Sequence, residues 1–210
     1  MICYIYNMIY LVITACLKPK VGIDDEEHRK RTYIESITNT LKVLPEGIKP
    51  IIVENNGPRP TFLDDFGVDV LYTDNNAHNF PSKAGNELAD VKAVIEHLRI
   101  KDDDMVIKLT GRYKVLSSTF FRHVMDDREG HDAFVKFFNV CTKMHTPGTD
   151  CVLGLVAMRA KYYKALQYRY AHNKSTESEF AVYASSMKCK HVDDLDLLCC
   201  FAGDHSTLHV

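Results

Sequence analysis

Apolar stretches typical of buried strands alternate with amphipathic helical stretches through the first half of this chain. The strand-like runs are rich in β-branched residues, and the stretches between them repeat apolar residues at the period of a half-buried helix. Strands joined by helices favour a parallel sheet covered on both faces. The expected strands are residues 9–19, 49–57, 68–76 and 104–113, and the expected helices are residues 25–44 and 85–100. The first half therefore predicts an α/β fold.

The second half of the chain has a more mixed pattern. Its expected strands are residues 132–140, 151–158 and 191–203, and its expected helices are residues 161–170 and 177–188. With 210 residues, of which 46% are hydrophobic, the chain can bury one full core. We therefore expect one domain over residues 1–210, in which a mostly parallel, mixed central sheet is flanked by helices.

The apolar opening, residues 1–17, has the hydropathy of a membrane span or a signal peptide. It contains Asn7 and three tyrosines and lacks the basic n-region of a signal peptide. It is also shorter than the roughly 20 residues that a helical span needs. We therefore expect a buried strand here and no membrane span.

The charge balance and the cysteines restrict the partners and the compartment. The formal net charge of -2 at pH 7 leaves no basic excess to neutralise a run of phosphates, so nucleic acid is not an expected partner. The seven cysteines are odd in number, and their spacing matches neither a repeated metal motif nor a disulfide framework. Such thiols are typical of a reducing compartment, so we expect a cytoplasmic protein.

Polar residues gather where the expected strands of the first half end. In open α/β sheets, ligands bind outside the carboxyl ends of the strands. Side-chain amides, hydroxyls and carboxylates at these ends supply donors and acceptors suited to a nucleobase and a ribose. The predicted nucleotide-binding residues are Thr14, Ala15, Glu54, Asn55, Asp74 and Asn75.

Three basic residues near the same edge are suited to a diphosphate. Lys83 lies just before the helix expected from residue 85, so its charge and the helix N-terminus can act on one phosphate, although an exposed position near a cap is the alternative. Lys108 continues an apolar strand and, once buried, needs an anionic partner from the protein or from a ligand. Arg112 supplies a planar fork that matches phosphate.

Two acidic runs have the spelling of metal sites but the wrong position. Residues 102–104 precede the strand expected at 104–113 and so enter it from the opposite edge of the sheet. Residues 193–196 likewise precede or enter an apolar strand. We expect both runs to be solvated turns. The chemistry is therefore predicted at the basic end of the strand, not at its acidic end.

The strand ends resemble those of GT-A glycosyltransferases, the class that uses nucleotide-sugar donors. The similar segments are TACLKP (14–19), VENNG (53–57), YTDNN (72–76) and KLTGRY (108–113). The last looks like the signature of small viral and bacterial glycosyltransferases, among them domains involved in capsid glycan synthesis in chlorella viruses. The resemblance spans nearly the full length of the chain.

This resemblance implies a hexosyltransferase that moves glucose or a 6-deoxyhexose such as rhamnose from a UDP-sugar to a glycan acceptor. It further implies a role in viral capsid glycan synthesis, in the host cytoplasm. Residues 1–113 would form the nucleotide-binding half and residues 114–210 the acceptor-side half. The residues predicted at the sugar and acceptor are Thr110, Gly111, His145 and Gly154.

The motif departs from the class where a metal is expected. Members of the class hold Mn²⁺ or Mg²⁺ against the diphosphate with an Asp-x-Asp pair, whereas Thr110 and Arg112 stand at those positions here. Either cationic side chains neutralise the diphosphate without a metal, or a metal binds through phosphate oxygens and other protein ligands. Asp204 and His205 are the predicted ligands in the second case, and a loosely ordered tail is the alternative for that segment.

An inverting transfer needs a carboxylate base. Glu177 and Glu179 lie at the start of an expected helix, where inverting members of the class often place their base. Because Thr176 and Glu179 have the spacing of a capping box, Glu179 is explained structurally. Glu177 is therefore the predicted base, with Asp204 as the second choice.

Two other functions fit the same pattern. One is a non-catalytic nucleotide-binding or scaffold domain that kept the fold and lost the metal motif. The other is a nucleotidyltransferase, which binds similar ligands on a related sheet. The absence of a glycine-rich loop after the first strand counts against nucleotidyl transfer and against P-loop or Rossmann chemistry.

Overall fold

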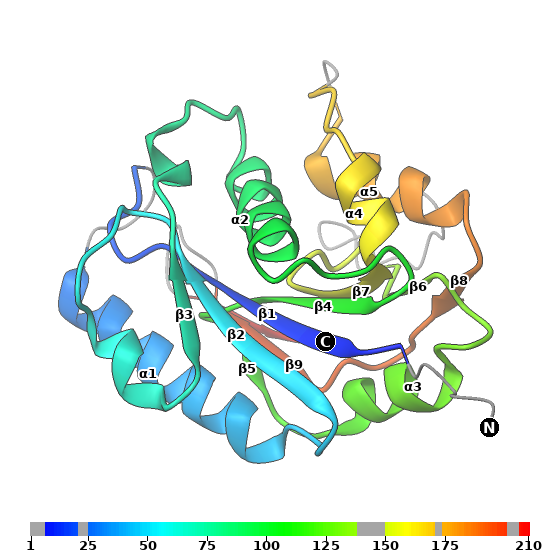
Figure 1. Cartoon of the computed structure of the whole chain (residues 1–210), viewed down its shortest axis with the longest axis horizontal. Coiled ribbons are helices and arrows are strands. Elements are labelled where there is room, and N and C mark those ends of the chain that lie inside the picture. The colour runs from blue at the N-terminus through cyan, green and yellow to red at the C-terminus, as the bar shows by residue number, and fades with distance from the viewer. Residues whose placement is uncertain (1–6, 21–24, 138–149, 171–173, 201–205) are drawn as a thin grey trace.

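The centre of the protein is a seven-stranded sheet with strands from both halves of the chain (Figure 1). The computed structural model describes residues 7–20, 25–137, 150–170, 174–200 and 206–210. The sheet has the order β3-β2-β1-β4-β7-β6-β8. Its strands are β1 (Ile9–Ala15), β2 (Ile48–Glu54), β3 (Asp69–Tyr72), β4 (Met105–Thr110), β6 (Ala133–Val135), β7 (Leu155–Arg159) and β8 (Cys189–His191).

The strand directions give a mostly parallel, mixed sheet. Strands β3, β2, β1 and β4 are parallel neighbours, whereas β7 is antiparallel to both β4 and β6. Strand β8 is again parallel to β6. The predicted α/β class, with a parallel first half and a mixed second half, is confirmed.

Helices cover both faces of the sheet (Figure 1). On one face lie α2 (Lys83–His97), α4 (Ala160–Ala165) and α5 (Thr176–Ser185). On the other lie α1 (Glu26–Val43) and α3 (Thr119–Asp127), together with a small antiparallel sheet of β5 (Lys114–Val115), β9 (Leu197–Cys200) and β10 (Thr207–His209). Two short 3₁₀ turns, η1 (Phe62–Phe66) and η2 (Asn75–Ala77), flank β3.

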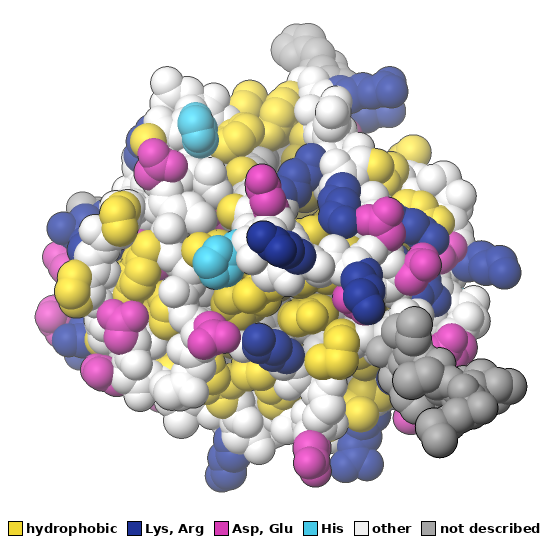
Figure 2. Space-filling view, in the orientation of Figure 1, with side chains coloured by type: hydrophobic (Ala, Val, Ile, Leu, Met, Phe, Trp, Pro, Cys, Tyr) yellow, Lys and Arg dark blue, Asp and Glu magenta, His cyan; other side chains and the backbone are white. Residues whose placement is uncertain are grey.

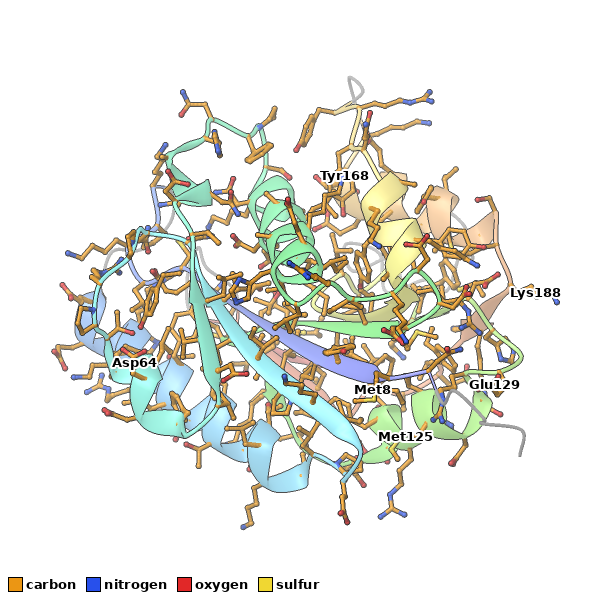
Figure 3. All side chains as sticks on the ribbon, viewed as in Figure 1. Met8, Asp64, Met125, Glu129, Tyr168 and Lys188 are labelled. Carbon is orange, nitrogen blue, oxygen red and sulfur yellow. The ribbon has the colours of Figure 1, made fainter. Side chains whose placement is uncertain are left out.

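Alternation along the strands divides the interior into two cores. In β1, Leu11 and Ile13 pack with α1 and α3, whereas Val12 packs with α2 and α5. Successive side chains of a strand point to opposite faces, so one apolar run serves both layers. Figure 3 labels Met125 below the sheet and Tyr168 above it, each packed against the core of its own layer.

Part of the apolar opening of the chain forms a strand of the central sheet. Residues 9–15 form β1, whose side chains are almost all buried. In the described part of the chain, no helix has the length and apolar character needed to cross a bilayer. Basic and acidic side chains are interspersed over the face seen in Figure 2.

Several elements of the second half differ from the prediction. The helix expected at 161–170 ends at Ala165, and the strand expected at 191–203 contributes β9 to the small sheet. Helix α3 and strand β8 were not predicted. Strand β8 is short and depends on pairing with β6, which is far away in the sequence, so a local pattern does not record it.

The strand register brings the ends of the first four strands to one edge. Ala15 of β1 pairs with Glu54 of β2, and Thr14 pairs with Thr110 of β4. Because these strands are parallel, their carboxyl ends and the start of α2 meet at this edge. The candidate site lies here.

Candidate functional site

Two adjoining cavities open at the carboxyl edge of the sheet. The first, of about 440 Å³, lies over the ends of β1 and β2 and the start of α2. The second, of about 230 Å³, lies over the end of β4 and the start of α5. The side chains that line both are Lys83, Glu87, Thr110 and Arg112. These residues form a shared wall between the two cavities.

Four cationic side chains line the first cavity: Lys20, Arg29, Lys83 and Arg112. Lys20 donates to the Ala77 carbonyl at 2.8 Å. Arg29 comes from α1, and its Nε donates to the Cys16 carbonyl at 2.7 Å. Arg112 donates through Nη1 to the Cys200 carbonyl at 2.9 Å. Burial lowers the pKa of the Lys83 ammonium, and the charges of Arg112 and Arg29 lower it further. Among the described residues, none of these cations forms an ion pair with a carboxylate.

The N-terminus of α2 adds to this positive region. Its N-cap residue, Ser82, makes no side-chain capping bond, and the first turn of the helix has no acidic residue. The Ser82 hydroxyl instead contacts the Thr176 hydroxyl at 2.8 Å. Ser82 and Lys83 both line the first cavity. Unpaired N–H groups at a helix start favour an anion, so the cations and the helix act in the same direction.

Lys108 is neutralised within the protein. Its ammonium forms an ion pair with Glu87 and donates to the Thr110 hydroxyl and the Leu153 carbonyl, each at 2.9 Å. A lysine has three N–H donors, and these three partners use them all. The anion that the sequence required beside Lys108 is therefore Glu87. Lys108 lines the second cavity and not the first, and its predicted contact with a diphosphate stays a prediction.

The predicted nucleotide-binding residues fall into two groups. Thr14, Ala15 and Asn55 line the first cavity. Glu54 does not, because its fully buried carboxylate is paired with Arg59 at 3.1 Å and accepts backbone N–H groups of the following loops. Glu54 therefore stabilises the loops around the cavity without lining it.

Asp74 and Asn75 also lie outside the cavity lining. Asp74 is exposed at the start of η2 and makes no capping bond there. Asn75 donates to the carboxylate of Asp90 at 2.8 Å. The following residue, Asn76, lines the cavity instead and donates to the Lys18 carbonyl at 3.0 Å.

Asp90 of α2 connects the loops that follow β2 and β3 through hydrogen bonds. Its carboxylate is fully buried and accepts hydrogen bonds from Asn55 at 2.8 Å, Asn75 at 2.8 Å and the Thr73 hydroxyl at 3.1 Å. Burial raises the pKa of Asp90 to about 7, even though the three donors act in the opposite direction. The charged form of this carboxyl is therefore costly in the folded protein.

This raised pKa predicts a pH-dependent stability. The carboxyl of Asp90 ionises near pH 4 in the unfolded chain and near pH 7 in the folded protein, so its stabilising contribution is complete below pH 4 and is lost as the pH rises to 7. From this group alone, we expect the free energy of unfolding to fall by up to about 1.4 kcal/mol per pH unit between these values. Urea denaturation at several pH values measures this slope. Asp90→Asn should flatten it, and equal slopes in the two proteins would contradict the assignment.

The second cavity combines a carboxylate with an aromatic and largely apolar wall. Glu177, in the first turn of α5, lines it together with Tyr113, Leu153 and Val152. In the described residues, no hydrogen bond or ion pair engages the carboxylate of Glu177. The predicted base therefore faces a cavity and is available to a ligand.

The capping box predicted for this helix is wrong. The N-cap is Ser175, whose side chain accepts from the Ser178 N–H. Glu179 instead accepts the Arg169 N–H at 2.7 Å. The helix therefore starts one residue earlier than the Thr176 cap implies.

The two glycines predicted at the sugar have packing roles. A Cβ on Gly154 would lie 2.2 Å from a ring carbon of Tyr113, so this glycine makes room for the tyrosine ring. A Cβ on Gly111 would lie 2.8 Å from the Thr14 carbonyl, to which the Gly111 N–H donates at 2.9 Å. Gly154 lines the second cavity, whereas Gly111 lines neither.

The residues at the shared wall do not fit a divalent metal. The end of β4 presents Lys108, Thr110 and Arg112, and Glu87 is already paired with Lys108. No cluster of three or more His, Cys, Asp or Glu suited to a metal occurs in the described residues. Hard cations need several oxygen ligands, which this wall lacks. The predicted ligands Asp204 and His205, and the predicted acceptor residue His145, lie outside the described residues.

The acidic runs lie away from both cavities. Asp102 and Asp103 form exposed ion pairs with Lys164 and Lys161 of α4. Asp104 is buried and accepts the N–H of Met8 at 2.9 Å, which secures the entrance to β1. Of this run, two residues are solvated as predicted, whereas Asp104 is a buried hydrogen-bond acceptor. The second acidic run, residues 193–196, immediately precedes β9, as the sequence indicated.

Sequence reasoning missed Arg29, Glu87 and Tyr113. Arg29 carries a usable signal, because it falls four residues before Tyr33 on the buried face of α1 and is itself buried. A basic residue on an apolar helix face needs an acceptor nearby. Glu87 and Tyr113 gave no such signal, because their roles depend on contacts between α2, β4 and β7.

Comparison with solved structures identifies the fold. A protein assigned as a nucleotide-diphospho-sugar transferase from Desulfovibrio desulfuricans superposes with a TM-score of 0.52 at 9% identity, over 88% of this chain and 79% of the other. CMP:2-keto-3-deoxy-manno-octonic acid synthetase, complexed with CTP, gives 0.52 at 12%, over 88% and 90%. This chain has the nucleotide-diphospho-sugar transferase fold.

A glycosyltransferase from Streptococcus pneumoniae has the same fold, with a TM-score of 0.51 at 11% identity over 90% of this chain and 46% of the other. The sequence itself matches no family model and no curated protein. The reactions of these structural neighbours differ. The choice among them therefore depends on the chemistry of the site.

Proposed function

We propose that this protein is a glycosyltransferase that moves a sugar from a nucleotide-diphospho-sugar to a glycan acceptor. The observation that carries the proposal is the positive region at the first cavity. Arg29, Lys83 and Arg112 meet there beside an uncapped helix N-terminus, without a carboxylate paired to any of them in the described residues. Like charges held together in this way favour an anionic ligand, and a diphosphate has the charge to neutralise them.

The two cavities provide separate spaces on either side of that diphosphate. The first cavity, of about 440 Å³, has polar groups from Thr14, Asn55 and Asn76 on its lining and accommodates a nucleoside. The second cavity adjoins it through the shared wall and offers the free carboxylate of Glu177. A donor with its nucleoside in the first cavity has its sugar directed to the second.

The proposed reaction is an inverting displacement at the anomeric carbon. An acceptor hydroxyl oxygen attacks that carbon, and its proton passes to the Glu177 carboxylate. The bond between the anomeric carbon and the diphosphate oxygen breaks, and the nucleoside diphosphate leaves with the electron pair. Arg29, Lys83 and Arg112 stabilise the negative charge that develops on the leaving oxygen. No step requires a metal ligand among the described residues.

The identity of the donor follows from the sequence resemblance. We propose a UDP-sugar carrying glucose or a 6-deoxyhexose such as rhamnose, and a glycan of the kind attached to viral capsids as acceptor. Residues 1–113 would bind the nucleotide and residues 114–210 would bind the acceptor. A cytoplasmic location is part of the same proposal, since the number and spacing of the cysteines are typical of a reducing compartment.

Nucleotidyl transfer is the rival reaction on this fold. It needs a nucleoside triphosphate and a place for a leaving pyrophosphate. The second cavity holds the Glu177 carboxylate and apolar side chains, including Val152 and Leu153, next to the shared wall. This composition suits a sugar and a hydroxyl nucleophile better than a second phosphate group.

The first test is calorimetric titration of the protein with UDP, GDP and CMP, each with and without Mn²⁺. Saturable binding of UDP supports the proposal, and equal affinity without Mn²⁺ is expected if the three cations hold the diphosphate. Absence of binding by every nucleotide would contradict a transferase and favour a scaffold. Binding of CMP alone would favour a nucleotidyltransferase.

Arg112→Ala should weaken UDP binding by about 10- to 100-fold, because it removes charged hydrogen bonds to the diphosphate. The matched control is Arg122→Ala on α3, since Arg122 is exposed and outside both cavities. Asp103→Ala should also leave binding unchanged. Weakened binding in Asp103→Ala with intact binding in Arg112→Ala would move the site to the acidic end of β4.

A further inference from the structure

Asn55 presents an unsatisfied acceptor at the wall of the first cavity. Asn55 is 3% exposed and lines that cavity, and its buried Oδ1 has no hydrogen-bond partner among the described residues. The amide nitrogen donates to Asp90 Oδ2 at 2.8 Å. A buried carbonyl without a partner is costly, and a ligand N–H would satisfy it.

Asp90 determines which end of this amide is free. An ionised carboxylate can accept but cannot donate, so it must face the NH₂ group of Asn55 and leave the carbonyl oxygen on the other side. The opposite oxygen of Asp90 already accepts from Thr73 and Asn75. The orientation of the Asn55 amide therefore follows from the charge of Asp90 and not from packing alone.

The position of Asn55 fits the base of the proposed donor. The shared wall, with its cations Lys83 and Arg112, lies at the end of β4 and the start of α2. Asn55 follows β2, and β1 lies between β2 and β4. Two strand spacings correspond to about 10 Å. A nucleoside diphosphate extended across the strand ends from this wall brings its base, rather than its phosphates, to Asn55.

Building on the proposed function, we infer that Asp90 is a positioning residue that selects the base by fixing the Asn55 amide. With its carbonyl presented, Asn55 accepts an imide N–H such as N3–H of uracil. Cytosine has an unprotonated N3, which would place two acceptors against each other. The site thus favours a base with a ring N–H, such as the uracil of the UDP-linked donor proposed above, and rejects cytidine nucleotides, which a structural neighbour binds as CTP.

The unaltered protein tests the acceptor directly. Calorimetric titrations with UDP, CDP and N3-methyl-UDP are carried out at pH 8, above the pKa of about 7 to which burial raises Asp90. We expect UDP to bind about tenfold or more tightly than either analogue, since each lacks the N3–H group. Equal binding of all three would overturn the inference.

Asp90→Asn tests the orienting role. The new amide can keep its oxygen toward Thr73 and Asn75 and its NH₂ toward Asn55, which turns the Asn55 amide and presents its NH₂ to the cavity. A donor then faces the base, so the preference should reverse and CDP should bind more tightly than UDP. Thr73→Val is the matched control, because it removes one hydrogen bond to Asp90 but leaves the carboxylate facing Asn55.

The outcomes separate this inference from the proposed function. Binding of UDP with no preference over CDP and N3-methyl-UDP overturns the role of Asn55 and Asp90 but retains a nucleotide diphosphate site. Absence of binding by every nucleotide diphosphate overturns both. If Asp90→Asn fails to fold, as judged by circular dichroism, the comparison of UDP with N3-methyl-UDP in the unaltered protein decides. An unchanged UDP preference in folded Asp90→Asn contradicts the orienting role.

Discussion

Replacing Glu177 by Gln is expected to slow the release of UDP from UDP-glucose by about 10²- to 10⁴-fold, the usual contribution of a general base. The carboxylate of Glu177 lines the second cavity, and no hydrogen bond or ion pair within the described residues engages it. Glutamine keeps the size of the side chain but cannot take a proton from the attacking hydroxyl or water. The affinity for UDP should change by no more than about twofold, because the proposed diphosphate site is formed by Arg29, Lys83 and Arg112 and not by Glu177.

The same helix turn supplies a matched control. Glu179→Gln preserves the acceptor for the Arg169 N–H and changes a carboxylate that lines neither cavity. Coupled detection of UDP measures both variants with water as the acceptor. Equal rates for Glu177→Gln and the unaltered protein would exclude Glu177 as the base. A product with the same anomeric configuration as the donor would exclude inversion.

The parallel half of the fold was predictable because its signals are local. Burial on both faces makes β1 and β4 continuous apolar runs, and the helix between β3 and β4 has its own apolar stripe. In contrast, β8 and β9 are short and half-exposed. Their assignment to different sheets depends on partners far away in the sequence, so periodicity does not specify it.

The candidate site was likewise predictable only where its signals are local. The rule that ligands bind at carboxyl strand ends pointed to Thr14, Asn55 and Arg112, and all three line the first cavity. The rule does not tell which polar residue faces the cavity and which one faces inward. Glu54 and Asn55 are adjacent, yet Glu54 pairs with Arg59 behind the loop and Asn55 lines the cavity.

Charge pairing distinguishes structural cations from ligand-binding ones. Arg59 and Lys108 are each matched by a carboxylate, namely Glu54 and Glu87. At the first cavity, Arg29, Lys83 and Arg112 have no such match in the described residues. Desolvation makes an unpaired charge costly, so matched cations stabilise the fold and unmatched ones favour a bound anion. The sequence alone does not distinguish these two kinds of cation, because the difference depends on contacts between helices and strands.

This distinction predicts a large loss of stability when Glu87 is removed. Glu87→Ala leaves the Lys108 ammonium, whose side chain is 5% exposed, without its counter-ion. Breaking a buried ion pair from one side costs about 3 to 5 kcal/mol in the free energy of unfolding. Urea denaturation measures this loss at a pH where both groups are charged.

Two further variants test whether the loss of stability comes from the unpaired charge of Lys108. Asp102→Ala breaks the exposed Asp102–Lys164 pair and should cost no more than about 1 kcal/mol. Adding Lys108→Met to Glu87→Ala removes the unpaired charge and should recover much of the stability, because a buried apolar side chain needs no counter-ion. If Glu87→Ala cost no more than Asp102→Ala, the ion pair would not be what holds Lys108 within β4. Lys108 would then be free for an anionic ligand in the second cavity, as the sequence first allowed.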